Sequence, residues 1–193
     1  MIVIGGYTIL ADVGSSILKL LRDNMTPEPI PKQEMIGLAS PADKGDFRLT
    51  MYLYSINEVG EFIYPEMRNV GLGLQQYPPL VVNLYYLLTA YSTAELNSRA
   101  LDEHRILARS IQVIYDNAVL RDSVLQGVAA ERNEEIRITR NNLSIEQLTD
   151  IWNRFVNVPY KLSMAYIVGP VNIDSTRIKE TRRVTGMEVN IKG

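Results

Sequence analysis

Residues 80–91 have the sequence Leu-Val-Val-Asn-Leu-Tyr-Tyr-Leu-Leu-Thr-Ala-Tyr and include the longest apolar stretch of this 193-residue chain. Apolar side chains at both odd and even positions are typical of a strand that is covered on both faces. The stretch is far shorter than the roughly 20 residues that a membrane-spanning helix needs. We therefore expect residues 80–91 to form a central strand of a sheet, and we expect no membrane insertion.

Three further segments have the pattern of strands. Residues 47–56 and 160–168 alternate apolar side chains with more polar ones, and residues 134–140 are a shorter segment of the same kind. Alternation places the apolar side chains on one face, which is the face that a sheet buries against helices. The Gly169-Pro170 pair is expected to end the last of these strands.

The remaining patterned segments are helical. Residues 8–24 and 99–117 carry apolar side chains three and four positions apart. Ser144 and Gln147 form a capping box that opens a further helix. These elements predict an α/β fold of the α+β type, a mixed sheet of about four strands flanked by helices. The expected inner stripe of the second helix consists of Ala100, His104, Leu107, Ile111, Ile114 and Tyr115.

Two segments lack such patterning. Residues 57–79 contain several glycines and prolines and are expected to be a long irregular loop, a kind of segment that is often functional. Residues 177–193 carry five basic residues against two acidic ones. We expect one domain over residues 1–176, followed by a basic C-terminal arm. The arm is either a disordered end or a strand that adds to the sheet edge of a partner.

Composition excludes several kinds of chemistry. The chain has no Cys, so a disulfide, a zinc finger and a thiol nucleophile are impossible, and with one His no multi-His site can be built within one copy. The formal net charge is −2 with both signs mixed along the chain, whereas nucleic-acid-binding domains usually carry a basic patch. No catalytic, metal-binding or cofactor-binding residues are therefore predicted, and no nucleic acid is expected as a partner. A chain without Cys also fits assembly in the cytoplasm.

Two residue groups could still suggest chemistry. His104 lies on the predicted core-facing stripe of its helix, which favours a structural role over a catalytic base. The acidic side chains of Glu131, Glu134 and Glu135 are interleaved with arginines, as on a solvated surface, which argues against a metal site. The 11 tyrosines are more informative, because tyrosine suits surfaces that an assembly covers. Ordinary strand composition is the alternative explanation.

Two motifs carry a family resemblance. The first consists of Pro78 and Pro79, followed by the apolar strand with the sequence Tyr-Leu-Leu-Thr-Ala-Tyr at its end. The second consists of the helix that includes His104, followed by the sequence Tyr-Asp-Asn-Ala-Val-Leu, which ends at Leu120. They resemble the cap, or tail-terminator, proteins of extracellular contractile injection systems, phage-tail-like particles of the antifeeding-prophage type. The resemblance covers about residues 7 to 170. The sequence departs from the family pattern at Asn83, Tyr115 and Ala118, where Asp, His and Pro are expected.

The resemblance implies a structural role without catalysis. Six copies would form a ring on the distal end of an inner tube, stop its growth and contact the last layer of the sheath. The implied partners are the chain itself as a homohexamer, the inner tube protein and the sheath protein, in a particle that is either released or membrane-attached. Interface candidates are Tyr52, Tyr54, Arg68, Tyr77, Tyr85, Arg177, Arg182, Arg183, Met187, Val189 and Ile191.

Two other functions remain open at this point. One is a binding module or assembly chaperone for a phage-tail-like secretion particle that forms no ring. The other is a hydrolase built on His104, the one imidazole that could act as a base.

Overall fold

The computed structural model describes residues 6–60 and 66–180. Its helices are α1 (Ile9–Met25), α2 (Leu96–Asp116), α3 (Gly127–Glu131) and α4 (Ile145–Trp152). Its strands are β1 (Ile36–Leu38), β2 (Leu49–Glu58), β3 (Arg68–Gly71), β4 (Leu74–Gln76), β5 (Leu80–Ala90), β6 (Val119–Leu120), β7 (Ile136–Asn141), β8 (Ser163–Ile173) and β9 (Ile178–Glu180).

The main sheet has six strands in the order β1-β2-β5-β8-β7-β6. β1 runs parallel to β2, and every other neighbouring pair is antiparallel. β5 lies between β2 and β8, which confirms the prediction of a central strand, and the mixed α+β class is confirmed as well. The sheet exceeds the predicted four strands because β1 and β6 have only three and two residues, too few for a visible alternation.

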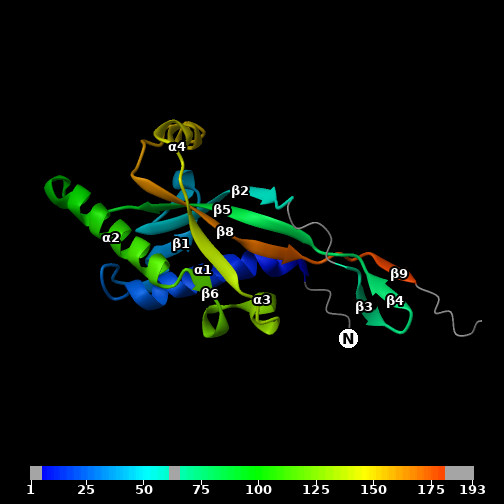
Figure 1. Ribbon diagram of the computed structural model, residues 1–193. Helices are drawn as coiled ribbons and strands as arrows, with labels where there is room; N and C mark the ends of the chain where they lie inside the picture. Colours follow the sequence, from blue (N-terminus) through cyan, green and yellow to red (C-terminus); the bar gives the residue numbers. More distant parts are fainter. Residues whose placement is uncertain (1–5, 61–65, 181–193) are drawn as a thin grey trace, which may run out of the picture.

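Helices α1 and α2 cover one face of this sheet, and the main core lies between them and the strands (Figure 1). The apolar side chains that are three and four positions apart in α1 are buried, as that spacing predicts: Ile9, Val13, Ile17, Leu20 and Leu21. From β5, every second side chain meets it: Val82, Leu84, Tyr86 and Leu88. Burial of this apolar stripe against the sheet is what holds α1 in place.

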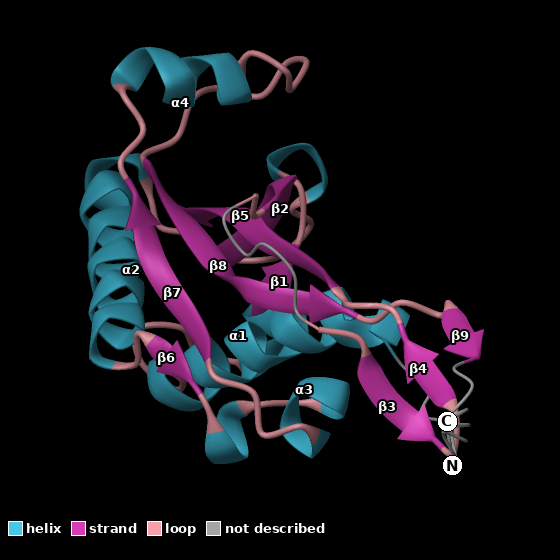
Figure 2. Cartoon of the chain, turned by 45° about the vertical axis from the view of Figure 1, so that its right-hand side comes forward, coloured by secondary structure: helices cyan, strands magenta, loops and turns pink. Residues whose placement is uncertain are grey.

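Helix α4 stands over the opposite face of the sheet, at the end where β7 ends and β8 begins (Figure 2). Its capping box is formed as predicted, with the Gln147 N–H donating to Ser144 Oγ at 3.2 Å. A second, smaller core fills the space beneath it, built on Leu87, Trp152 and Ala165. The other side of β5 is therefore covered along only part of its length.

Two sequence predictions about strand ends are wrong. Residues 57–79 are not wholly irregular, because β2 continues to Glu58 and the hairpin of β3 and β4 follows. Strand β8 does not end at the Gly169-Pro170 pair but continues to Ile173. The pairing of β5 with β8 shifts register there. An irregularity of this kind accommodates a proline, which has no N–H for the ladder.

The predicted inner stripe of α2 is right for Leu107, Ile111 and Ile114, which face the core, and wrong for Ala100, His104 and Tyr115. His104 is exposed, and Tyr115 is 82% exposed. The buried side chains of α2 are Ile106, Leu107, Ser110, Val113 and Ile114. The helix is thus rotated so that buried Ser110, whose hydroxyl donates to the Leu107 carbonyl at 2.7 Å, occupies the core side.

Candidate assembly surfaces

The strands β3, β4 and β9 form a separate three-stranded sheet that projects from one end of the main sheet (Figures 1 and 2). β9 pairs antiparallel with β4, from Leu74 opposite Glu180 to Gln76 opposite Ile178. The first part of the predicted C-terminal arm therefore lies as a strand on the chain's own hairpin. All three side chains of β9 are exposed, so this small sheet presents a surface to solvent.

Three interface candidates lie on or beside this small sheet. The guanidinium of Arg177 lies over the ring of Tyr77, 4.0 Å from its centroid. The Tyr77 N–H donates to the Arg177 carbonyl at 3.0 Å. Arg68 is exposed on β3, opposite Gln76 of β4. The structure thus brings Arg68, Tyr77 and Arg177 onto one projecting element.

An ionic cluster sits where the chain leaves β8 toward this sheet. Arg132 pairs with Asp174 and lies 3.7 Å from Glu134. Burial raises the pKa of the Glu134 carboxyl, and the neighbouring Arg132 opposes that rise. The backbone of Asp174 packs against Gly6, where a Cβ would come within 2.9 Å of the Asp174 nitrogen. These contacts fix the exit of β8, from which β9 is reached.

The three strand tyrosines named as interface candidates lie on the α4 side of the sheet. Tyr52 meets the Phe155 ring edge to face at 5.5 Å, and Tyr54 meets Tyr85 at 6.1 Å. Asn141 donates to the Tyr54 hydroxyl at 3.0 Å, and burial raises the pKa of Tyr54. Each tyrosine is half-buried, so part of each ring already has a partner within the chain.

Exposed apolar side chains gather in sequence around α4. Ile145 at its start is 62% exposed, and Val156 just after it is 82% exposed. Tyr160 and Leu162 follow on the way to β8, with 46% and 54% exposed. Ile145 and the segment after α4 therefore present exposed apolar side chains that the sequence analysis did not name as interface candidates.

The residues once considered for chemistry form no reactive constellation. Asp102, beside His104 in sequence, pairs with Arg48, and Glu103 accepts a bond from Lys161 at 2.6 Å. No group of acidic or histidine side chains that could hold a metal ion occurs in residues 6–60 and 66–180. Within the same residues, no helix has the length and apolar character needed to cross a membrane.

The remaining interface candidates, Arg182, Arg183, Met187, Val189 and Ile191, lie outside the described residues. The sequence did contain a signal for the missed hairpin. Gly71 and Gly73 flank a single residue, Leu72, which is 94% exposed, and Gly73 has a φ of +74°. A glycine with positive φ between two short polar segments is a turn signal of hairpins.

Comparison with solved structures identifies the fold. The sheath/tube terminator of the PVC extracellular contractile injection system, in its extended state, matches with a TM-score of 0.67 and 18% identity, over 95% of this chain and 63% of that chain. The anti-feeding prophage tube-terminating cap matches with a TM-score of 0.59 and 18% identity, over 94% and 61%. The chain thus spans less than two thirds of either terminator. No curated protein gave a significant match.

The family assignment rests on the sequence itself. A family model described as the Pvc16 N-terminal domain matches residues 12–186. The match extends from the first turn of α1 to beyond β9, so it includes both sheets and all four helices described above. On this evidence the chain belongs to the Pvc16 N-terminal domain family.

Proposed function

We propose that the chain is a tail terminator that caps the inner tube of a contractile injection system. The observation that carries this proposal is the fold, which matches two tube-terminating proteins over about 95% of the chain. The family match points the same way. In this role six copies form a ring on the distal end of the tube, end its growth and meet the last layer of the sheath. A closed ring with head-to-tail contacts suits the end of a stacked tube.

The exposed surfaces suit such a role. The small sheet with Arg68, Tyr77 and Arg177 projects from one end of the molecule, and α4 carries exposed Ile145 at the other. A basic and aromatic surface at one end and an apolar one at the other allow a subunit to contact different neighbours at once. We assign the small sheet and the outer side of α4 to contacts with neighbouring subunits, tube and sheath.

Catalysis has no part in this proposal. His104 is exposed on α2, and its acidic sequence neighbours Asp102 and Glu103 are engaged in ion pairs with other side chains. We therefore expect His104→Ala to leave capping unchanged. Assembly takes place in the cytoplasm in this proposal, and the finished particle is either released or membrane-attached.

Tube length tests the proposal directly. The inner tube protein of the same system is polymerised with and without the chain, and the tubes are imaged by electron microscopy. A terminator gives shorter tubes with extra density at one end, and averaging of that end shows six copies. Tubes of unchanged length with the chain bound along their sides would instead identify a binding module or chaperone that forms no ring.

A further inference from the structure

The sheet edge beside β2 lacks a strand along most of its length. β1 pairs with β2 only from Ile36 opposite Leu49 to Leu38 opposite Met51. The chain then turns away at Ser40, whose hydroxyl accepts a bond from the Ala42 N–H as a short helix begins at Pro41. Within the described residues, β2 from residue 52 to 58 is paired on one side only, by β5.

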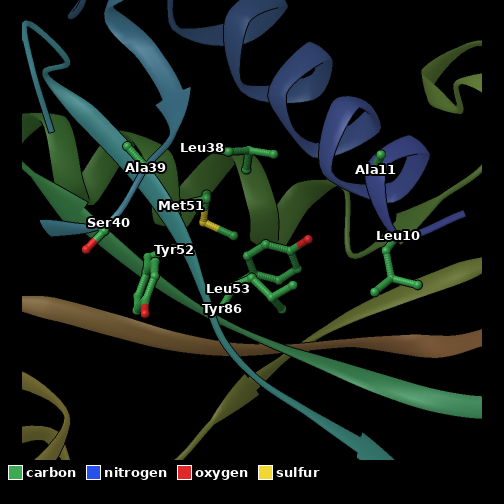
Figure 3. Close-up of a pocket in the computed structure, with 9 residues that line it drawn as sticks. All are labelled: Leu10, Ala11, Leu38, Ala39, Ser40, Met51, Tyr52, Leu53 and Tyr86. Atoms are coloured by element: carbon green, nitrogen blue, oxygen red, sulfur yellow. The ribbon is translucent and has the colours of Figure 1, made fainter. Parts of the chain in front are cut away.

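An apolar groove lies at the start of this open edge, where β1 turns away from β2. It has a volume of about 380 Å³ and is bounded by Leu10 and Ala11 of α1 on one side and by β1, β2 and β5 on the other (Figure 3). The sheet side contributes Leu38, Met51, Leu53 and Tyr86. A strand added to β2 would lie over this groove and place every second side chain into it.

An exposed apolar side chain, Ile56, continues the apolar surface of the groove along β2. Leu38 is 42% exposed and Ile56 is 45% exposed. A register shift between Leu53 and Ser55 turns Ile56 to the same face as Leu53. Residues 49–58 contain no proline and no lysine, the residues that commonly protect free edges. An unprotected edge over an apolar groove is the arrangement that strand addition requires.

The C-terminal segment of the chain has the matching pattern. Residues 181–193 follow β9, and Met187, Val189 and Ile191 alternate there with Glu188 and Asn190. Three apolar side chains at a period of two present one apolar face about 14 Å long, which fits the seven-residue open edge of about 20 Å. The alternate face is polar, as the solvent side of an edge strand should be.

The position of β9 favours a second copy over the same copy as the source of this strand. β9 belongs to the small sheet that projects away from the main sheet (Figures 1 and 2). Glu180, the last residue of β9, therefore lies beyond the end of the main sheet. Fully extended, the 13 residues that follow β9 span at most about 45 Å, about twice the length of the open edge.

We propose that residues 184–193 of one copy add as a strand to the open edge of β2 in the next copy, with Met187, Val189 and Ile191 in the apolar groove. This contact rests on the proposed ring and links its subunits head to tail. A chain of such contacts closes when the rotation between copies closes. It also gives the ring a connection that survives small shifts of the rigid domains.

Disulfide trapping tests the contact, because the chain has no cysteine of its own. The full chain carries Ile56→Cys together with Val189→Cys, and oxidation is followed on non-reducing gels. We expect interchain products to form at least ten-fold faster than in two matched controls. The first control replaces Val189→Cys by Asn190→Cys, on the polar face, and the second replaces Ile56→Cys by Leu101→Cys on α2, where Leu101 is 60% exposed.

A filled groove supplies an independent readout. Ala11 is exposed on α1 and lines the groove, so Ala11→Trp should fill it while leaving the fold intact by circular dichroism. Adding Ala11→Trp to the pair of Ile56→Cys and Val189→Cys is expected to slow interchain disulfide formation at least ten-fold. A free peptide of residues 181–193 should slow interchain disulfide formation in that pair without Ala11→Trp to the same extent. Equal trapping rates in all pairs, or only intrachain products, would overturn the proposal. Because no tube protein is present, this failure is distinct from a failure to cap.

Discussion

The guanidinium of Arg177 stacks on the ring of Tyr77 at 4.0 Å, and the backbones of the same two residues share a hydrogen bond. The contact joins the residue before β9 to the residue after β4. It therefore links β4 to β9 at the point where β4 ends and β9 begins. A cation over an exposed aromatic face contributes about 0.5–1 kcal/mol.

We expect Arg177→Ala to loosen β9 without unfolding the domain. The amides of β4 and β9 should exchange with solvent several-fold faster in hydrogen–deuterium exchange, while those of β5 stay protected. Lys179→Ala, an exposed residue of β9 itself, is the matched control and should change little. Equal exchange in the two variants would show that the stacking does not hold β9.

A second prediction concerns the ion pair of Arg48 and Asp102. The two side chains are 12% and 25% exposed, and Asp102 also accepts a bond from the Ser92 hydroxyl. Asp102→Ala leaves a largely buried guanidinium without its partner, which should cost about 3 kcal/mol in the free energy of unfolding. Urea denaturation of the single and double variants measures this cost.

The double variant Arg48→Met with Asp102→Leu should recover most of that loss, because neither charge then remains buried. The exposed pair of Lys19 and Asp23 is the control, and Asp23→Ala should cost less than about 1 kcal/mol. If the double variant is no more stable than Asp102→Ala, the buried charge is not the cause of the loss.

The sequence predicts the parts of this fold that have strong periodic patterns. β5 is recognisable as a central strand because both of its faces are apolar, and α1 because all five residues of its stripe are buried. The helix phase of α2 was found only in part, because its core side includes the polar residue Ser110, whose hydroxyl is satisfied by the Leu107 carbonyl. A polar residue on the core side shifts the inferred stripe.

The candidate surfaces were predictable only in part. Tyr77 and Arg177 lie close together because β9 pairs with β4, although the two strands are about 100 residues apart in the sequence. Strands of three residues are too short to show a periodic pattern of apolar side chains. The groove exists because β1 ends opposite Met51 of β2. Such a strand register depends on how two segments pair, so it cannot be inferred from the pattern of either segment alone. Only the hairpin turn at Gly73 had a local signal.

A third prediction concerns the attachment of α4. Trp152 is the only tryptophan of the chain and is 3% exposed in the small core, so its fluorescence reports whether α4 is docked. Ser144→Ala removes the capping bond to the Gln147 N–H and should destabilise α4 by about 1 kcal/mol. We expect the tryptophan emission to shift at lower urea than the far-ultraviolet circular dichroism changes.

Thr149→Ala in the same helix is the control. Its hydroxyl only donates back to the Ile145 carbonyl, a bond that does not stabilise helices. This variant should keep the parent transition or raise it slightly. A single transition, with both signals lost together in Ser144→Ala, would mean that α4 unfolds with the main core and not before it.

The last prediction concerns alkaline pH. Burial raises the pKa of Tyr86 and that of Tyr166 to about 12 from the ordinary value of 10.0. A raised pKa means that the unfolded chain loses these protons first. Stability from the two neutral tyrosines is therefore fully present below pH 10 and is lost as the pH rises toward 12. The loss is about 1.4 kcal/mol per pH unit for each group.

Tyr86→Phe removes one of these two buried hydroxyls and should make the fall of stability between pH 10 and 12 shallower by about 1.4 kcal/mol per unit. Urea denaturation at a series of pH values measures this slope. Tyr115→Phe is the control, because Tyr115 is 82% exposed and its ionisation needs no opening of the core. If both variants lose stability as steeply as the parent chain, then the ionisation of Tyr86 does not drive alkaline unfolding, and other buried groups must do so.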